Sequence, residues 1–298
     1  MRRLKRLIWL VFVLACAGCA GYIVKSRMVE DHTPPVITCG EDTISISVED
    51  DESALLEGVK AEDNRDGDLT DSVRVASMSH FINGKRTVTY AVFDKANQLG
   101  TLERTVEYTD YTSPKIHMSS PLRFGTSELD DVNLSESLTA EDCLDGDLTS
   151  QIRTIVDNSY YGMQTGACTV TLQVSNSAGD VCSVPVEMTI VDSQDREERD
   201  KEYPLLSEYI VYTSVNQAID PGAYLKGIER NGTEYTYESD GEMLAGTQEA
   251  IGITSNVDYA TPGVYTVEYS YTAEGAATAV TKLYVVVEGE QDEQSGES

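Results

Sequence analysis

The chain has 298 residues, which is long for one domain and predicts two or three. Its hydrophobic fraction of 40% is typical of a globular protein and excludes disorder throughout. Its formal net charge of −29 argues against a nucleic-acid partner, because so acidic a chain repels phosphate backbones.

An uncharged run opens the chain at residues 7–24 (LIWLVFVLACAGCAGYIV). As a helix it spans roughly 27 Å, close to the hydrocarbon thickness of a bilayer. The first 27 residues carry six basic and no acidic side chains, and four of the basic ones precede the run. The positive-inside rule then makes residues 1–6 a cytoplasmic tail and sends the rest of the chain outside. The sequence therefore predicts a signal anchor in the cell membrane, crossing it once, with extracellular C-terminal domains.

Two other readings of this N-terminus stay open. A cleaved signal peptide leaves a secreted protein, although the apolar run continues past the small residues to Val24 without a polar cleavage region. A lipid anchor uses Cys16 or Cys19, although neither has the usual residues in front of it. An uncleaved anchor is the favoured reading.

The chain then repeats itself at an offset of 79 residues. The segment AEDNRDGDLT (61–70) matches AEDCLDGDLT (140–149) at eight of ten positions, and we call this segment the DGDLT element. An opening segment, DHTPPVIT (31–38), matches DYTSPKIH (110–117) at the same offset. Two homologous domains are therefore predicted at 31–110 and 111–192.

Within each repeat the hydrophobic pattern has a period of two. Val88, Tyr90 and Val92 alternate with smaller or polar residues, and turn signals recur every eight to twelve residues. Such short alternating strands are typical of an antiparallel β-sandwich or barrel. A stretch at 52–56 is the one helix-like segment expected after residue 24.

A third, divergent domain is predicted at 203–288, after a charged linker at 193–202. It has no DGDLT element but ends in two similar strands, PGVYTVEY (262–269) and KLYVVVE (282–288). Residues 289–298 are too polar and acidic to bury a core, which predicts a disordered tail.

These motifs resemble the bacterial immunoglobulin-like repeat of Gram-positive surface proteins, which also occurs in some insecticidal crystal proteins. The resemblance covers about 160 of 298 residues and is weakest in the third domain. It implies an all-β chain of three tandem Ig-like antiparallel β-sandwiches after one N-terminal transmembrane helix. Departures from the pattern include Asn97 in place of glycine and Asn176 in place of the aspartate found at Asp94.

A module of this kind is non-catalytic and serves in binding, adhesion or spacing at the cell surface. The chain has no nucleophile elbow, zinc-protease motif or phosphate loop, and its three histidines are few for a catalytic centre, so no enzyme is predicted. The alternative function is a glycan-binding or cell-wall-binding accessory protein. The expected partner is an unidentified surface protein or glycan, together with the membrane through residues 7–24.

No cofactor is predicted, apart from calcium as an open alternative. In an Ig-like sandwich, the loop holding the DGDLT element and the loop before the last strand meet at one end, and their oxygens suit a hard cation. The candidate ligands are Asp63, Asp66, Asp68 and Asp94 in the first repeat, and Asp142, Asp145, Asp147 and Asn176 in the second. The competing and favoured reading makes these side chains turn residues that accept backbone N–H groups.

The same topology brings Cys143 and Cys182 near each other, and an exported domain permits a disulfide. Closing that loop of about 40 residues stabilises a fold by roughly 3–4 kcal/mol. Free thiols are the competing reading, because the first repeat has Asn64 and Gly100 at these two positions.

Overall fold

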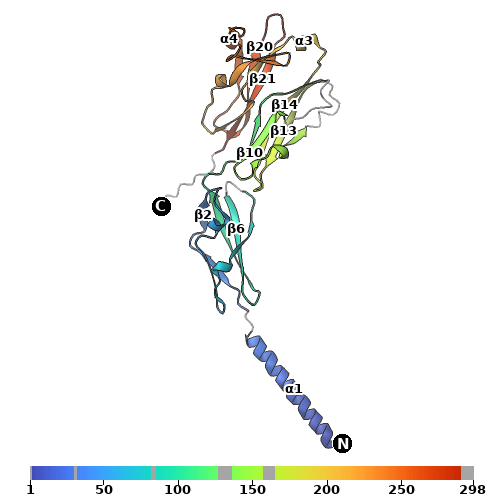
Figure 1. Cartoon of the computed structure of the whole chain (residues 1–298), viewed down its shortest axis with the longest axis vertical. Coiled ribbons are helices and arrows are strands. Elements are labelled where there is room, and N and C mark those ends of the chain that lie inside the picture. The colour runs from blue at the N-terminus through green and yellow to red at the C-terminus, as the bar shows by residue number, and fades with distance from the viewer. Residues whose placement is uncertain (1, 30–31, 82–84, 127–135, 157–164, 290–298) are drawn as a thin grey trace. The chain divides into compact units, whose positions relative to one another are not determined.

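The computed structural model describes residues 2–29, 32–81, 85–126, 136–156 and 165–289 (Figure 1). Residues 7–24 lie within helix α1 (Arg2–Val29). Among the helices described, none combines the length and the apolar character needed to cross a membrane. The anchor is therefore not confirmed and stays a prediction from the sequence, and most of the predicted C-terminal tail lies outside the described residues.

The described chain separates into two compact units. Unit 1 comprises Met1–Ser79 and Lys85–Thr109, and unit 2 comprises His80–Gly84 and Asp110–Ser298. Unit 2 holds the sandwich expected in the second repeat together with the divergent third one. The two sandwiches expected at 111–192 and 203–288 are therefore parts of one compact body.

Unit 1 is a β-sandwich of a three-stranded sheet, β1–β3–β4, and a four-stranded sheet, β2–β7–β6–β5. Its strands are β1 (Val36–Cys39), β2 (Thr43–Ile46), β3 (Val59–Asp63), β4 (Gly67–Asp68), β5 (Arg74–Met78), β6 (Lys85–Phe93) and β7 (Leu99–Tyr108). The short helix α2 (Glu52–Leu55) confirms the helix predicted at 52–56, and the 3-10 turn η1 (Thr70–Ser72) follows β4.

The alternating pattern of β6 faces the core of unit 1 as predicted. Val88 and Tyr90 are fully buried, and Val92 is 1% exposed. The Tyr90 hydroxyl donates to the carbonyl of Leu55 in helix α2, which ties that helix to the sheet. Burial of an aromatic ring with a satisfied hydroxyl is strongly stabilising, so β6 is the central strand of this core.

The first sandwich of unit 2 repeats this arrangement with sheets β11–β10–β8 and β12–β13–β14–β9. Its elements are β8 (Lys115–Met118), β9 (Leu122–Gly125), β10 (Leu138–Asp142), β11 (Gly146–Asp147), η3 (Thr149–Gln151), β12 (Arg153–Val156), β13 (Gly166–Ser175) and β14 (Val181–Val191). The long β13–β14 hairpin is prominent in Figure 1.

The second sandwich of unit 2 has sheets β15–β17–β18 and β16–β21–β20–β19. Its elements are β15 (Glu202–Leu206), β16 (Ile210–Ser214), η5 (Pro221–Tyr224), β17 (Leu225–Arg230), β18 (Thr233–Thr236), α4 (Thr247–Ala250), β19 (Gly252–Ser255), β20 (Gly263–Tyr271) and β21 (Ala279–Glu288). Helix α3 (Arg196–Arg199) lies in the linker. Helices α3 and α4 were not expected from the sequence.

One strand in each four-stranded sheet departs from the antiparallel prediction. Strand β2 pairs in parallel with β7, β9 with β14, and β16 with β21. In each case the strand follows an edge strand of the opposite sheet after a few residues. The chain crosses from one sheet to the other without reversing its direction. The strand that follows the crossing therefore runs parallel to the last strand of its domain.

The two sandwiches of unit 2 are joined by buried side chains. One hydrophobic cluster runs through both, from Ile116 and Leu138 to Val267 and Leu283. The Tyr212 hydroxyl accepts from the Ile116 amide (2.7 Å) and donates to the Ile116 carbonyl (3.0 Å). This bidentate contact saturates a backbone position at the open edge of β8, which explains why the sandwiches form one unit.

Charged and aromatic contacts reinforce the junction. The Tyr284 hydroxyl accepts from the Glu187 amide at 2.7 Å, and Lys282 pairs with the Glu187 carboxylate, also at 2.7 Å. Arg123 forms an ion pair with Glu229, and its guanidinium lies 3.5 Å from the ring centroid of Tyr203. Burial at the junction raises the pKa of Tyr284 to about 12, so its hydroxyl keeps its proton at neutral pH.

Candidate functional site

The DGDLT element of unit 1 forms the turn between β3 and β4. Asp63 Oδ1 accepts the backbone amides of Arg65 and Asp66, each at 2.8 Å. Asp68 Oδ1 accepts the amide of Thr70 at 2.9 Å. Two of the four candidate ligands in this repeat therefore hold the backbone of their own turn.

Asp66 joins this turn to the β6–β7 loop. Its carboxylate accepts the Lys95 amide at 2.8 Å and the Lys95 ammonium at 2.9 Å. The next residue back, Asp94, is 6% exposed and accepts the Gln98 amide at 2.7 Å. The two loops expected to meet at one end of the sandwich do meet, through a carboxylate of one and a lysine of the other.

Unit 2 repeats these contacts with different residues. Asp142 Oδ1 accepts the amides of Leu144 (2.8 Å) and Asp145 (3.0 Å), and Asp147 Oδ1 accepts the Thr149 amide at 2.9 Å. The turn between β10 and β11 is therefore built as in unit 1.

The cross-loop contact of unit 2 uses a serine. Asp145 accepts the Ser177 amide at 2.5 Å and the Ser177 hydroxyl at 2.7 Å. The neighbouring Asn176 donates its side-chain amide to Asp142 Oδ2 at 3.1 Å and to the Tyr111 hydroxyl at 2.8 Å. All eight candidate residues thus lie at the predicted sandwich ends, in hydrogen-bonded turns.

Three or more His, Cys, Asp or Glu side chains able to hold a metal ion together are not found among the described residues. The hydrogen bonds above show why. Asp66, Asp68, Asp145 and Asp147 turn their carboxylates toward N–H or O–H donors of their own domain. These four carboxylates therefore act as hydrogen-bond acceptors within their own domains.

The predicted disulfide is not formed, and Cys143 and Cys182 are free thiols. Cys143 Sγ donates to the Thr112 carbonyl at 3.2 Å, whereas Cys182 Sγ lies 3.5 Å from the Tyr212 hydroxyl. Burial raises the pKa of the Cys182 thiol. Each sulfur has its own partner, and Cys182 belongs to the junction with the second sandwich, a contact that the repeat alignment does not reveal.

The turn carboxylates predict an acid-sensitive fold. Hydrogen bonds lower the pKa of four aspartates below the usual 3.8: Asp63 and Asp66 through backbone N–H groups, Asp68 and Asp147 through threonine. A lowered folded-state pKa contributes stability that is present above pH 3.8 and is lost as the pH falls through the folded value. In Asp66→Asn, thermal unfolding followed from pH 6 to pH 2 is expected to depend less on pH than in the wild type. Asp71→Asn, at an exposed carboxylate of η1, serves as the control, and an equal pH slope in Asp66→Asn and the wild type contradicts this role.

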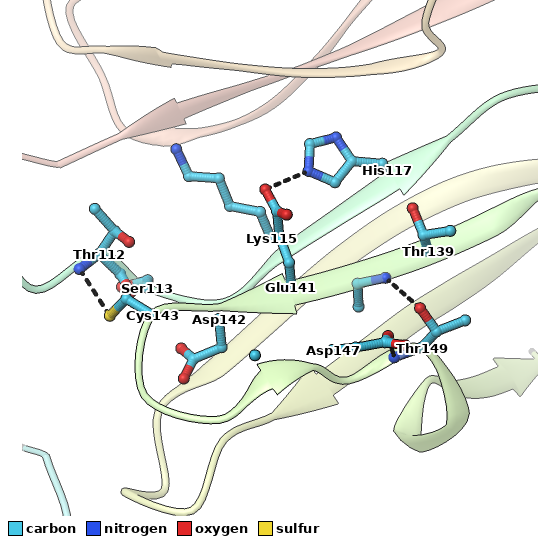
Figure 2. Close-up of a pocket in the computed structure, with 12 residues that line it drawn as sticks. Thr112, Ser113, Lys115, His117, Thr139, Glu141, Asp142, Cys143, Asp147 and Thr149 are labelled. Carbon is cyan, nitrogen blue, oxygen red and sulfur yellow. Dashed lines mark hydrogen bonds and ion pairs between the residues drawn. The ribbon is translucent and has the colours of Figure 1, made fainter. Parts of the chain in front are cut away.

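A groove of about 610 Å³, lined mostly by polar residues, lies beside the DGDLT element of unit 2 (Figure 2). It follows the outer face of the β8–β10–β11 sheet. Alternation along β8 buries Ile116 and Met118 in the core and turns Lys115 and His117 to the other face. The groove is lined by Thr112, Ser113, Lys115, His117, Thr139, Ala140, Glu141, Asp142, Cys143, Gly146, Asp147 and Thr149.

Polar and charged side chains face one another at the groove. His117 Nε2 lies 3.5 Å from the Glu141 carboxylate, as Figure 2 shows. Lys115 Nζ lies 5.0 Å from the ring centroid of Tyr212 and 3.6 Å from the Glu288 carboxylate. An ammonium, an imidazole, carboxylates and hydroxyls on one face can donate to and accept from a polar ligand.

Lys115, His117 and Glu141 were not among the residues selected from the sequence. Their signal was present: Lys115 and His117 occupy the outward positions of an alternating strand. The missing information was the register, which sets Glu141 opposite Lys115 and Thr139 opposite His117 in neighbouring strands.

No protein-family model and no curated protein matches the chain. Among solved structures, the CBM51-2 and INT domains of Clostridium perfringens ZmpB, in complex with GlcNAc, share 19% identity over 50% of this chain and 26% of theirs, with a TM-score of 0.21. The lipoprotein BT2262 of Bacteroides thetaiotaomicron shares 14% identity over 83% of this chain and 98% of its own, with a TM-score of 0.19.

Drosophila N-cadherin EC1-4 shares 11% identity over 87% of this chain and 76% of its own, with a TM-score of 0.24. The chain spans only about a quarter of the ZmpB structure. These TM-scores are too low to assign a fold or a function. The β-sandwich assignment therefore rests on the strand topology, and the function rests on the residues of this chain.

Proposed function

We propose that this chain is a non-catalytic binding protein of the cell surface, and that unit 2 recognises its ligand through the groove along β8, β10 and β11. The observation that carries the proposal is a groove lined mostly by polar residues and built on a strand that is hydrogen-bonded to the next sandwich. Lys115 and His117 project from a short strand in which the amide and carbonyl of Ile116 are both bonded to Tyr212 of the next sandwich.

Rigidity favours recognition over simple spacing. Side chains held on a preorganised strand lose little conformational freedom on binding, which leaves more of the contact energy as affinity. Lys115 is held against the Tyr212 ring, and His117 stands beside the Glu141 carboxylate. A spacer has no need of such an arrangement on one outer face.

The groove chemistry suits a polar ligand with both donors and acceptors, such as a glycan or an extended peptide of a surface protein. A glycan-binding or cell-wall-binding accessory role is the second form of the same proposal. Thr112, Ser113 and Thr139 add hydroxyls and backbone groups, which are the partners that sugar hydroxyls use.

Binding of the full chain to a glycan array, to isolated peptidoglycan and to a library of surface-protein peptides tests the proposal. In the double variant Lys115→Ala/Glu141→Gln, affinity for the ligand found is expected to fall about tenfold or more, since each 1.4 kcal/mol lost is a factor of ten. Lys226→Ala, which breaks the surface pair with Glu234, is the matched control. If the groove variant and the wild type bind with equal affinity, the binding site lies outside the groove. If the chain binds none of the probes, the proposed recognition role is wrong and a spacer role is favoured.

The proposal also includes attachment at the cell surface through residues 7–24. In cells, the full chain is expected to sediment with membranes, and external protease is expected to remove everything after about residue 30. Replacing Leu10 and Val13 by aspartate introduces charges into the apolar run and is expected to release the chain from the membrane fraction. A soluble mature form that begins near residues 18–22 contradicts the anchor and indicates a secreted protein.

A further inference from the structure

One carboxylate oxygen in unit 1 is buried without a partner. Asp63 is 8% exposed, and its Oδ1 accepts the two turn amides described above, which fixes the orientation of the carboxylate. Its Oδ2 is inaccessible to solvent and has no hydrogen-bond donor. Such an orphaned charged oxygen costs free energy unless a donor or a cation compensates it.

Unit 2 shows what belongs at this position. The equivalent oxygen, Asp142 Oδ2, accepts the side-chain amide of Asn176 at 3.1 Å. Asn176 is itself oriented by its Oδ1, which accepts the Asp180 amide at 2.9 Å. The second repeat therefore satisfies its buried carboxylate with a neutral N–H donor.

Unit 1 has an aspartate where that donor is needed. Asp94 corresponds to Asn176 and is also buried. Its Oδ1 accepts the Gln98 backbone amide at 2.7 Å, as Asn176 Oδ1 accepts that of Asp180, and its Oδ2 accepts the Gln98 side-chain amide at 3.3 Å. A carboxylate offers no N–H, so the residue at this position cannot donate to Asp63 Oδ2 as the Asn176 amide donates to Asp142 Oδ2. The turn hydrogen bonds of the two repeats otherwise agree within a few tenths of an ångström.

We propose that unit 1 binds a hard divalent cation such as calcium between Asp63 Oδ2 and the carboxylate of Asp94. The cation supplies the positive charge that the Asn176 amide nitrogen supplies in unit 2. Asp66 is already paired with the Lys95 ammonium, and Asp68 accepts the Thr70 amide, so neither adds a buried oxygen without a partner. This site is separate from the groove of unit 2 and does not depend on it.

Two carboxylates are few for calcium, which takes six to eight oxygen ligands, so water and backbone oxygens must complete the shell. Calcium binds more weakly when fewer of its ligands are charged. With two carboxylates we expect a dissociation constant on the order of 1 mM, at the weak end of the range for extracellular modules. Cation binding to the folded form alone stabilises it, and it slows local opening of the two loops.

Hydrogen exchange of the full chain, read by mass spectrometry in 10 mM calcium chloride and in chelator at equal ionic strength, tests the site. Peptides that cover residues 59–70 and 91–100 are expected to exchange several-fold more slowly in calcium. Peptides that cover residues 138–149 and 173–182 serve as the internal control and are expected to be unchanged.

Exchanging the two residues between the repeats makes the test specific. Asp94→Asn supplies the amide of unit 2 and is expected to abolish the calcium effect while keeping unit 1 protected in chelator. Asn176→Asp is expected to make the second pair of peptides respond to calcium, a gain that does not depend on the folding of the first variant. Equal exchange in calcium and chelator for the wild type, or a calcium effect that persists in Asp94→Asn, overturns the proposal.

Discussion

Replacing Tyr212 and Tyr284 by phenylalanine is expected to separate unit 2 into two independently unfolding sandwiches. Phenylalanine keeps both rings in the junction and removes only the hydroxyls. The amide and carbonyl of Ile116 and the amide of Glu187 then lose their partners. A buried backbone group left unpaired costs about 1–3 kcal/mol, so the double variant loses several kcal/mol of coupling between the sandwiches.

Differential scanning calorimetry of the full chain measures this. The wild type is expected to show one transition for unit 2 in addition to that of unit 1, and the double variant two transitions at lower temperatures. Tyr265→Phe is the matched control, because its hydroxyl donates to Thr261 within the same sandwich at 2.9 Å and is exposed. A single unchanged transition in the double variant means that the hydrophobic cluster alone couples the sandwiches.

The sequence predicts well which face of a sheet each strand residue occupies, because buried and exposed positions alternate residue by residue along a strand. Val88, Tyr90 and Val92 were assigned to one face from their spacing, and all three lie in the core. It predicts pairing poorly, because pairing is set by contacts between distant segments. The parallel edge strands β2, β9 and β16 follow from the path of the chain between sheets, which a local pattern does not record.

In the candidate site, too, the position of the turns was predicted from the sequence and their bonding partners were not. Repetition of the DGDLT element marked the sandwich ends correctly, since both turns hold the loop before the last strand. The partners differ between the repeats, however: Lys95 binds Asp66, and Ser177 binds Asp145. Such contacts depend on which residue the second loop offers, and no spacing rule within the first loop predicts it.

The junction of unit 2 was not predicted for a related reason. Tyr212 lies in an alternating strand like many other tyrosines of the third domain, and its ordinary role there is to pack between strands. Its hydroxyl instead binds Ile116, 96 positions earlier in the chain. Only the relative placement of two sandwiches within one unit reveals this contact, and with it the reason that the thiol of Cys182 stays free beside it.

Gly100 shows how far the two repeats differ at one position, and it gives the last prediction. Gly100 in β7 corresponds to Cys182 in β14, so Gly100→Cys merely copies the second repeat into the first. A Cβ atom at position 100 lies 2.1 Å from the carbonyl oxygen of Pro35, a distance at which backbone must move. The opening segment of unit 1 therefore lies directly on β7.

Gly100→Cys is expected to destabilise unit 1 by about 3 kcal/mol, the upper part of the range for overpacked sites, because the clash is with backbone and not with a flexible side chain. The calorimetric transition of unit 1 then falls by several degrees, while that of unit 2 does not change. Gly40→Ala, where an added Cβ meets nothing within 4 Å, is the control and is expected to be nearly neutral. If Gly100→Cys is as stable as the wild type, the segment at Pro35 can move away from β7, and its contact with Gly100 contributes little to the fold.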